Sequence, residues 1–390
     1  VSSSLVLIVK VPMSSRKDQF VTIEALRLHS LEIPLVRPFR TSFGTQNVRD
    51  VMLVEAIDSD GVRGWGECVT LGWPGYNAEY TAGAVRLIEE YLAPIVLGKE
   101  WTPESVRAAL EVIRGNHIAR ASVSTAILDV WLRQQGMSLA EYLGAVRSEV
   151  ECGVSVGIPT SETIDELLEE VGSYVDAGYR RIKLKIEPGW DIDPVAAVRE
   201  RWPSIPLQVD ANQAYTREHA GHLARLDEFN LLLIEQPLGE EDWWGHRLVA
   251  EACETPICLD ESILSVESAE SAIEFGAASN INIKPGRVAG FLQSKEIHDL
   301  CLSRGIPVWC GGMLETGIGR AANVALAALP GFTLPGDTSA SNRYYAEDVT
   351  EPFVLHDGML TVPTGPGIGI DPLPENLKTM SVNVVELTAG

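Results

Sequence analysis

The feature that most constrains the fold of this chain is a repeated unit of a short apolar strand, a polar turn and an amphipathic helix. The units run from about residue 145 to about residue 337. Strands this rich in Val, Ile and Leu are typical of parallel sheets, which are buried on both faces. Eight strands are predicted, in the segments ECGVSVGI, RRIKLKI, PLQVDAN, LLLIEQP, PICLDES, NINIKP, PVWCGG and FTLPGD. They indicate a closed barrel, because an open doubly wound sheet usually carries a GxGxxG motif after an early strand, and none follows a strand here.

The residues before Gly144 are arranged differently, with strands first and helices afterwards, which is typical of an α+β unit. Two alternating stretches, VTIEALRLHSLEIPL and DVMLVEAIDSDGVRGWGE, are predicted to be strands, with a hairpin turn at Asp60-Gly61. Helices are predicted at about residues 78–97, 103–115 and 119–135. Later, in the barrel region, Thr163 or Ser161 is predicted to cap a helix that ends at Gly178.

The residues from about Thr338 onward contain no further strand-helix unit. Their Pro/Gly-rich stretch TVPTGPGIGIDPLP is interpreted as a tail that returns over the first domain. The 390 residues suit one barrel of about 250 residues plus a smaller domain. The opening VSSSLVLIVKVP is shorter than the roughly 18 apolar residues of a membrane span, so it is interpreted as an extension or the start of a strand. Met13 is a candidate internal start.

Charge and cysteine content narrow the class of partner. The net charge is −23, and no run of Lys or Arg interrupts the acidic balance, so nucleic acid and anionic membranes are excluded as partners. A small anionic substrate would need a local positive focus, which a divalent cation and a few lysines supply. The six cysteines are scattered without a CxxC motif, which favours reduced thiols and a cytoplasmic protein.

Five ionisable residues stand at the C-terminal ends of consecutive predicted strands. Lys185, Asp210, Glu235, Asp260 and Lys284 are spaced 25, 25, 25 and 24 residues apart, which is the length of one strand-helix unit. A barrel gathers the ends of all its strands at one mouth, where active sites lie. Three neighbouring carboxylates repel one another unless a cation lies among them, and oxygen ligands select Mg²⁺ or Mn²⁺ over zinc. The spacing therefore predicts a metal site.

Each of these residues also has a plainer interpretation. Asp210 or Asp260 alone would equally be the N-cap of the following helix. Lys183 and Lys185 share one face of their strand, as in a solvated edge strand protected by lysines, although apolar strands flank this one on both sides in the sequence. Lys284 would equally be a helix-start lysine in solvent. Its mirrored place across the carboxylate strands favours the site, with one lysine on each side.

This arrangement predicts the removal of a proton from a carbon next to a carboxylate. Deprotonation there places a second negative charge on an anionic group, and a bound divalent ion stabilises the resulting enediolate. The base must be neutral, and a lysine near other cations is lowered to a pKa of about 7 to 8. Arg287 is a candidate for such a neighbouring cation, and a solvent-facing arginine in the first helical turn is the alternative.

The motifs KLK, VDAN, IEQP, LDES and NIKPGR, in this order, resemble the enolase superfamily, which pairs a capping domain with a modified (β/α)₇β TIM-like barrel. Lysines on both sides, with no His-Asp pair, look like its muconate-lactonizing subgroup. Within that subgroup the segments PFRTSFG, GWGECV, KLKIEPGWD, GGMLETGIGR and FTLPGDTSAS resemble the o-succinylbenzoate synthase and N-succinylamino acid (N-acylamino acid) racemase family. The likeness spans about residues 20 to 375.

The resemblance implies an α+β capping domain at residues 20–145, the barrel at 146–340 and a C-terminal segment at 341–390 that returns to the capping domain. It also implies Mg²⁺, or Mn²⁺ in its place, and a small anionic substrate, an N-acylamino acid or a cyclohexadiene carboxylate. A homo-oligomer is expected. The metal ligands would be Asp210, Glu235 and Asp260, and the acid/base pair would be Lys185 and Lys284 with Lys183 in support.

The resemblance further implies a set of substrate-binding residues. Gly311 and Gly312 would offer backbone donors to the distal part of the substrate, and the loop from Phe39 to Gly44 with Leu71 would close over its hydrophobic end. For the loop residues, ordinary packing between the domains is the alternative. Asn212 and Arg287 are assigned to the same site.

The enediolate has three fates, namely racemisation, dehydration to o-succinylbenzoate in menaquinone biosynthesis, and cycloisomerisation. Dipeptide epimerases carry Asp-x-Asp after the eighth strand to hold an ammonium, whereas this chain has Asp337-Thr338-Ser339. N-succinylamino acid racemase activity is therefore predicted, with o-succinylbenzoate synthase activity in the same site as the alternative. A Schiff-base aldolase at Lys284 would need no metal carboxylates. A zinc hydrolase would need histidines at the strand ends, and a silent binding barrel would not respond to EDTA.

Overall fold

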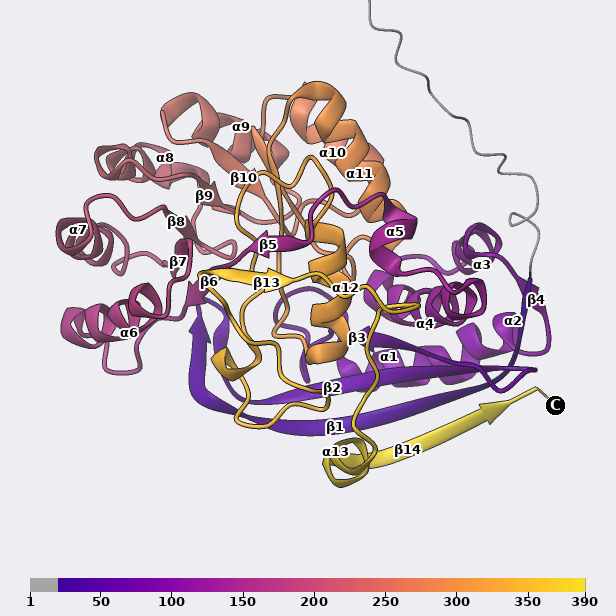
Figure 1. The fold of residues 1–390 in the computed structure, drawn as a ribbon. Coiled ribbons are helices and arrows are strands. Elements are labelled where there is room, and N and C mark those ends of the chain that lie inside the picture. The colour runs from indigo at the N-terminus through magenta and orange to yellow at the C-terminus, as the bar shows by residue number, and fades with distance from the viewer. Residues whose placement is uncertain (1–19, 390) are drawn as a thin grey trace, which may run out of the picture.

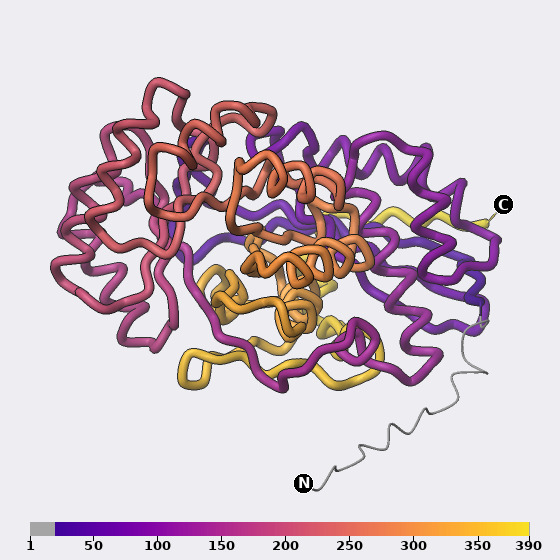
Figure 2. Tube along the Cα trace, turned by 90° about the horizontal axis from the view of Figure 1, so that it is seen from above, coloured from indigo at the N-terminus to yellow at the C-terminus, as the bar shows by residue number. Residues whose placement is uncertain are grey.

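The computed structural model describes residues 20–389, so the interpretations of VSSSLVLIVKVP and Met13 lie outside the described residues. Within this range an antiparallel sheet with helices on one face packs beside a parallel barrel (Figure 1). Figure 2 shows the C-terminal segment running beside the N-terminal strands. No helix of the described range combines the length and the apolar character that crossing a bilayer requires.

The antiparallel sheet has the order β14-β1-β2-β3, with the short strand β4 pairing with β1 at its start. Its strands are β1 (Val21–Thr41), β2 (Gly44–Asp58), β3 (Arg63–Cys68), β4 (Glu100–Trp101) and β14 (Ser381–Thr388). The predicted hairpin turn is confirmed, because β2 and β3 are joined through Gly61 at a φ of +79°. The tip of the long β1-β2 hairpin reaches the mouth of the barrel.

The helices of this domain are α1 (Thr81–Leu87), the π-helix η1 (Ile88–Leu92), α2 (Ala93–Val96), α3 (Pro103–Leu110), α4 (His117–Gln135) and α5 (Leu139–Leu143). Helix α3 begins at Pro103 as predicted, behind a Thr102 cap, but ends before the predicted residue 115. Helix α4 lies against β3. A Cβ on Gly66 would stand 2.1 Å from Ser122 O, so glycine is required for this close approach.

Seven parallel strands form the barrel sheet, in the order β12-β11-β10-β9-β8-β7-β6. They are β6 (Gly153–Val156), β7 (Arg181–Lys185), β8 (Leu207–Asp210), β9 (Ile234–Glu235), β10 (Ile257–Leu259), β11 (Asn280–Ile283) and β12 (Val308–Cys310). The helical segments between and after them are α6 (Ile164–Asp176), α7 (Ile192–Arg201), η2 (Arg217–His219), α8 (Ala220–Leu223), η3 (Ala224–Phe229), α9 (Trp243–Ala252), α10 (Val266–Glu274), α11 (Phe291–Arg304) and α12 (Gly317–Ala327). Thr163 caps α6 as predicted.

The eighth predicted strand, at FTLPGD, is wrong as a strand. Only two isolated bridges remain there, from Val308 to Phe332 and from Cys152 to Gly336. Pro335 has no N–H to donate to a ladder, which limits regular pairing. The segment nevertheless lies between β12 and β6, and so it completes the ring of strands in the (β/α)₇β arrangement.

The tail returns to the first domain as predicted. It begins with the short 3₁₀ turn η4 (Ser341–Arg343), and strand β13 (Met359–Thr361) then pairs with β5 (Glu149–Glu151). Helix α13 (Pro374–Met380) follows and leads into β14. Leu139 N donates to Gly367 O at 2.7 Å. Strand β14 then pairs antiparallel with β1 between Ala25 and Leu31.

A buried histidine supports the loop that follows β9. His246 Nε2 accepts a hydrogen bond from Leu238 N at 3.2 Å and lies 3.4 Å from Gln236 Nε2. A protonated ring would turn an N–H toward these N–H donors. Burial lowers the pKa of His246 to about 4, so the folded chain keeps this imidazole neutral.

The stability of the fold is predicted to fall as the pH is lowered from about 6.5 to about 4. In this window the unfolded chain takes up a proton that folded His246 refuses, and the free energy of unfolding drops by about 3 kcal/mol. Denaturant unfolding at pH 7, 5.5 and 4 measures the slope. His246→Gln is expected to reduce the dependence of the unfolding free energy on pH, whereas His356→Gln, at an exposed position, should leave that dependence unchanged. Equal slopes in both variants would contradict the assignment.

Candidate active site

The five spaced residues meet at the C-terminal end of the barrel sheet. Lys185, Asp210 and Glu235 are the last residues of β7, β8 and β9, and they lie side by side in register. Asp260 and Lys284 follow directly after β10 and β11. All five are buried, with Lys185 the most exposed at 8%. The solvated interpretations of both lysines are therefore wrong.

Lys185 is held entirely by side chains of the barrel. Its ammonium Nζ lies 2.6 Å from Asp210 Oδ2 and 2.5 Å from Asn212 Oδ1. Asn212 in turn donates from Nδ2 to Glu261 Oε1 at 3.1 Å. Burial lowers the pKa of Lys185 below its ordinary value, which favours the neutral amine that a base requires.

Lys183 lies deeper in the barrel and is paired with more carboxylates. Its Nζ lies 2.7 Å from Asp337 Oδ2, 3.0 Å from Glu235 Oε2 and 3.3 Å from Asp210 Oδ2. It also stands over the ring of Trp309, 4.6 Å from the centroid. Burial alone would lower the pKa of Lys183, but these carboxylates raise it above the ordinary value. Lys183 is therefore a fixed cation.

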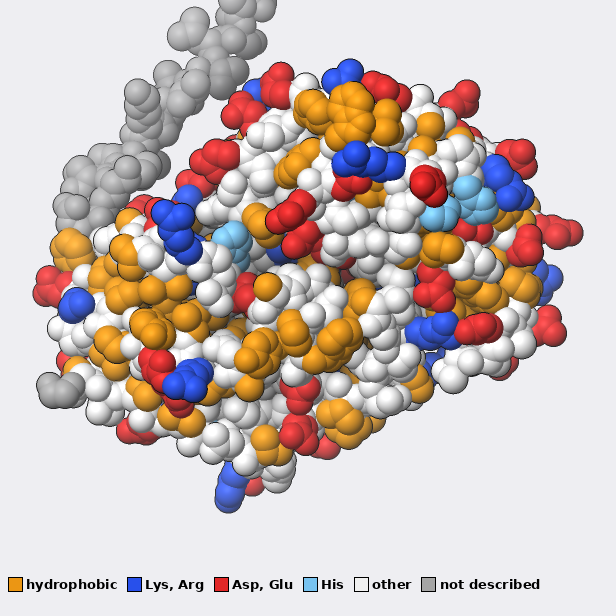
Figure 3. Space-filling model, turned by 180° about the vertical axis from the view of Figure 1, so that it is seen from behind, with side chains coloured by type: hydrophobic (Ala, Val, Ile, Leu, Met, Phe, Trp, Pro, Cys, Tyr) orange, Lys and Arg blue, Asp and Glu red, His pale blue; other side chains and the backbone are white. Residues whose placement is uncertain are grey.

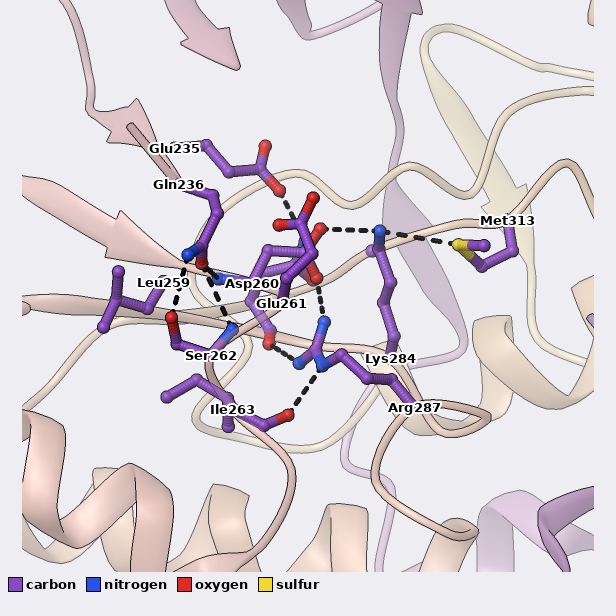
Figure 4. A network of polar contacts seen from close by, with 12 residues as sticks. Glu235, Gln236, Leu259, Asp260, Glu261, Ser262, Ile263, Lys284, Arg287 and Met313 are labelled. Atoms are coloured by element: carbon purple, nitrogen blue, oxygen red, sulfur yellow. Dashed lines mark hydrogen bonds and ion pairs between the residues drawn. The ribbon is translucent and has the colours of Figure 1, made fainter. Parts of the chain in front are cut away.

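Lys284 reaches the same site from the far side of the carboxylate strands (Figure 4). Its Nζ lies 2.7 Å from Asp260 Oδ2, 3.3 Å from the Tyr76 hydroxyl and 3.6 Å from Met313 Sδ. Burial opposes the charged form, yet Tyr76 and the surrounding carboxylates raise the pKa of Lys284 above its ordinary value. The prediction that neighbouring cations lower the pKa of this lysine is therefore wrong, because the groups around it are mainly acidic.

Arg287 is fully buried, so its solvent-facing interpretation is wrong. Its guanidinium pairs with Asp260 Oδ1 and donates to Asn282 O at 2.5 Å and Ile263 O at 2.6 Å. Figure 4 shows it below Lys284, and the two cations contact different oxygens of the Asp260 carboxylate. Arg287 therefore fixes the Asp260 carboxylate, and it does not line the cavity described below.

The carboxylates are turned toward protein cations and amides. Glu235 Oε1 accepts from Asn282 Nδ2 at 2.7 Å, while Asp210 and Asp260 face the lysines and Arg287. Among residues 20–389, no three His, Cys, Asp or Glu side chains are gathered closely enough to hold a metal ion. One feature of the donor set nevertheless suits a cation. Glu261 Oε2 is buried with no hydrogen-bond partner, and burial next to Asp210 raises the pKa of Glu261 to about 7.

A cavity opens above these residues, with an empty volume of about 470 Å³ that includes its open mouth. Lys185 and Lys284 both line it, and so does Lys183. Of the predicted substrate-binding residues, the ones that line it are Phe39, Leu71, Asn212 and Gly312. Gly311 does not, and its N–H is already donated to Ile283 O at 3.1 Å.

The tip of the β1-β2 hairpin is fastened over the mouth of the cavity. Ser42 Oγ donates to Ala211 O at 3.0 Å, and Arg40 forms ion pairs with Glu162 at 2.6 Å and Glu187 at 2.9 Å. These contacts join the first domain to loops after three different barrel strands. The cavity is therefore bounded by both domains.

Sequence reasoning missed Tyr76, Met313 and Glu261. Glu261 directly follows Asp260 in the LDES motif, so its neighbourhood was a usable signal. Met313 directly follows Gly311 and Gly312 after β12, so it too had a usable signal. Tyr76 carries no spacing signal, because it lies between β3 and α1 of the first domain. Asp337 was recognised from the sequence as a residue after the eighth predicted strand, but its pairing with Lys183 and Arg181 was not predicted.

Two family descriptions match the chain. Residues 23–144 match the mandelate racemase / muconate lactonizing enzyme N-terminal domain, and residues 166–376 match the enolase C-terminal domain-like family. The chain therefore belongs to the enolase superfamily, a class of enzymes, and the predicted fold class is confirmed.

Particular relatives narrow this class. The chain is 56% identical over 361 residues to N-succinylamino acid racemase from Amycolatopsis sp., a match that covers 92% of this chain and 97% of that one. It is 46% identical over 353 residues to o-succinylbenzoate synthase from Geobacillus kaustophilus, covering 90% and 94%. A solved enolase superfamily member from Listeria innocua is 40% identical with a TM-score of 0.90, covering 94% and 99%.

Asp337 neutralises two buried cations at the base of the site. Its carboxylate lies 2.7 Å from Lys183 Nζ and 2.8 Å from Arg181 Nη1, and neither cation is more than 2% exposed. Although burial opposes ionisation, the two cations hold the pKa of Asp337 well below its usual range. Asp337 is therefore already committed to protein partners.

Asp337→Ala is predicted to lower the free energy of unfolding by about 3 to 5 kcal/mol, because it leaves two buried charges without a partner. Denaturant unfolding at pH 7 measures the loss. Glu251→Ala, which removes the exposed pair with Arg247, is the matched control and is expected to cost less than about 1 kcal/mol. A loss at Asp337 as small as at Glu251 would contradict the buried network.

Proposed function

We propose that this enzyme removes the proton α to a carboxylate, with Mg²⁺ and an enediolate intermediate, and that it racemises N-succinylamino acids or other N-acylamino acids. The observation that carries the proposal is the pair of buried lysines on one cavity. Lys185 and Lys284 belong to β7 and to the end of β11, and three carboxylate strands lie between them. Each lysine can therefore approach a bound carbon from its own side.

Asp210, Glu235 and Asp260 would hold the Mg²⁺, or Mn²⁺ in its place. All of their donor atoms are oxygen, the type that these hard cations select, and Glu261 offers a further unpartnered oxygen beside them. When bound, the cation supplies electrostatic stabilisation for the second negative charge of the enediolate. Because the carboxylates now face lysines and Arg287, the proposal requires their side chains to turn.

The roles of the lysines follow from their surroundings. In the proposed reaction one of Lys185 and Lys284 removes the α-proton, and the other returns a proton to the opposite face. A carboxylate and one uncharged partner hold Lys185 Nζ, and a carboxylate and two uncharged partners hold Lys284 Nζ. Lys183 Nζ is bound to three carboxylates, whereas Lys185 and Lys284 are each bound to one, so we assign Lys183 to supporting the site.

The surroundings of Asp337 favour an N-acylated substrate over one with a free ammonium. Its carboxylate is already bound to Lys183 and Arg181, and so it is not available to pair with a substrate ammonium. An acylated nitrogen carries no charge to satisfy. Phe39 and Leu71 line the cavity with apolar surface suited to the substrate side chain or acyl group. The name of the Amycolatopsis relative agrees with this choice.

Dehydration to o-succinylbenzoate is the second candidate reaction. It shares the first step and the same lysines, and the Geobacillus relative bears that name. A comparison of turnover of the cyclohexadiene precursor with turnover of a panel of N-succinylamino acids distinguishes the synthase reaction from the racemase reaction. Muconate-type cycloisomerisation and dipeptide epimerisation are less supported.

Location and assembly belong to the same proposal. The six cysteines are free thiols, in keeping with the cytoplasmic location that we propose. Acidic side chains are spread over the face in Figure 3, with basic ones scattered among them. This surface suits a small-molecule enzyme better than a nucleic-acid or membrane partner. A homo-oligomer remains our expectation.

In D₂O with Mg²⁺, the α-hydrogens of N-succinyl-L- and N-succinyl-D-phenylalanine are predicted to exchange, as followed by proton NMR. Lys185→Ala and Lys284→Ala should each abolish racemisation, because one face then lacks its acid or base. Each variant is expected to retain exchange of at most one enantiomer. Absence of exchange with both this substrate and N-succinylmethionine would remove the racemase proposal, and precursor turnover would then test the synthase.

The enzyme is predicted to bind Mn²⁺, measured by electron paramagnetic resonance of the free ion, and to lose exchange activity in EDTA. Asp210→Asn and Glu235→Gln should each weaken Mn²⁺ binding at least tenfold, because each removes one charged oxygen ligand. Glu241→Gln, which alters an exposed carboxylate after β9, is the control and should bind as the wild type does. Wild-type binding by both site variants would contradict the proposed ligands.

A further inference from the structure

We propose that Tyr76 is a positioning residue for Lys284, so that one half of the acid/base pair depends on the capping domain. The other half, Lys185, takes its side-chain partners from the barrel alone. This inference rests on the proposed function, and it names the residue that makes the two halves unequal.

Tyr76 touches Lys284 in two ways. The Lys284 ammonium Nζ lies 3.3 Å from the Tyr76 hydroxyl and 4.5 Å from the centroid of its ring. The hydroxyl also donates to Asp260 Oδ1 at 3.0 Å, so it bridges the lysine and its carboxylate. Tyr76 is only 5% exposed. A lysine has a flexible four-carbon stem, and contacts of this kind fix where its ammonium lies.

The contacts of Lys284 come from two domains. Asp260 and Met313 belong to the barrel, whereas Tyr76 belongs to the segment between β3 and α1 of the capping domain. Tyr76 is therefore the one contact of the Lys284 ammonium, among those described, that the barrel does not supply. If the capping domain shifts, this contact shifts with it.

The segment that carries Tyr76 is fastened inside the capping domain. Thr81 N donates to Leu71 O at 2.8 Å, which closes the segment across its ends. The Glu79 carboxylate accepts from Ile118 N at 3.0 Å and Ala119 N at 3.1 Å, at the start of helix α4. The segment therefore moves as part of the capping domain and not as a free loop.

Lys185 also has an uncharged partner, but this partner belongs to the barrel and not to the capping domain. Asn212 lies 2.5 Å from the Lys185 ammonium and is held by Glu261, and both follow barrel strands. On this side the capping domain provides Ser42, which donates to the backbone oxygen of Asn212 at 3.2 Å, and Arg40, which pairs with Glu187 at 2.9 Å. Neither of these contacts is made with the Lys185 ammonium. The orientation of Lys185 therefore does not require a capping-domain side chain.

The consequence is an effect on one enantiomer. A proton is removed from each enantiomer by the lysine on its own face, and Lys284→Ala identifies the enantiomer that Lys284 serves. In Tyr76→Phe, exchange of that enantiomer is expected to slow about tenfold, a loss typical of a displaced acid/base group. Tyr76→Leu, which also removes the ring, should slow it further. Exchange of the other enantiomer should change less than twofold in both variants.

Two matched variants complete the experiment. Asn212→Ser removes the uncharged partner of Lys185 and should slow the opposite enantiomer. Tyr80→Phe removes a phenol hydroxyl from the same segment at a position that is 41% exposed, and both rates should stay at the wild-type level. Thermal unfolding confirms that each variant is folded. Equal slowing of both enantiomers in a folded Tyr76→Phe, or no slowing in either Tyr76 variant, overturns the inference.

A second measurement keeps this test separate from the proposed reaction. Acetic anhydride labels lysine amines, and peptide mass spectrometry compares labelling of Lys284 with that of Lys185. Tyr76→Leu should raise the ratio severalfold, because the Lys284 ammonium loses its fixed contact. An unchanged ratio overturns the positioning role. If wild-type enzyme exchanges neither enantiomer while the ratio rises, the reaction assigned above is wrong and the positioning role stands.

Discussion

The site depends on one electrostatic constraint, which is that each lysine at the mouth of the barrel, like Arg287, is buried beside a carboxylate. Removing an ammonium or a carboxylate from water carries a large free-energy penalty, which close pairing and hydrogen bonding must offset. Lys183, Lys185 and Lys284 are each within 3.0 Å of a carboxylate oxygen, and Arg287 is bound to Asp260. The parallel strands make this pairing possible, because they bring residues about 25 positions apart to neighbouring ends.

The same constraint separates the lysines by role. Lys183 has three carboxylate neighbours and remains charged, whereas Lys185 has a single close carboxylate and one amide, and burial lowers its pKa. Lys284 also has a single close carboxylate, Asp260, besides a phenol and a thioether, yet Tyr76 and the more distant carboxylates raise its pKa. The whole acidic surroundings of a lysine, and not its closest partner alone, therefore set the direction of its pKa shift.

The sequence predicts those parts of the fold and site that depend on contacts between residues close together in the chain. The ends of β7 to β11 were predictable, because apolar runs define buried strands and their pitch places one ionisable residue on each. The eighth strand was not, since Phe332 and Gly336 make only isolated bridges and a proline interrupts the run. The burial of Arg287 was not predictable either, because it depends on three oxygens from different parts of the chain. Tyr76 arrives from another domain, so no spacing rule could place it. The metal ligands and the lysine roles remain predictions.

The pairing of β14 with β1 bears on the order in which this enzyme is assembled during translation. Arg27 and Glu386 join these strands at 2.6 Å, although almost the whole chain separates them. A nascent chain that has left the ribosome as far as the barrel still lacks the edge of its first sheet. Such non-local pairing is slow to form, so the capping sheet is completed after the barrel strands have been made. Truncation or mutation of residues 381–388 would thus destabilise the domain at the opposite end of the polypeptide, which was synthesised first.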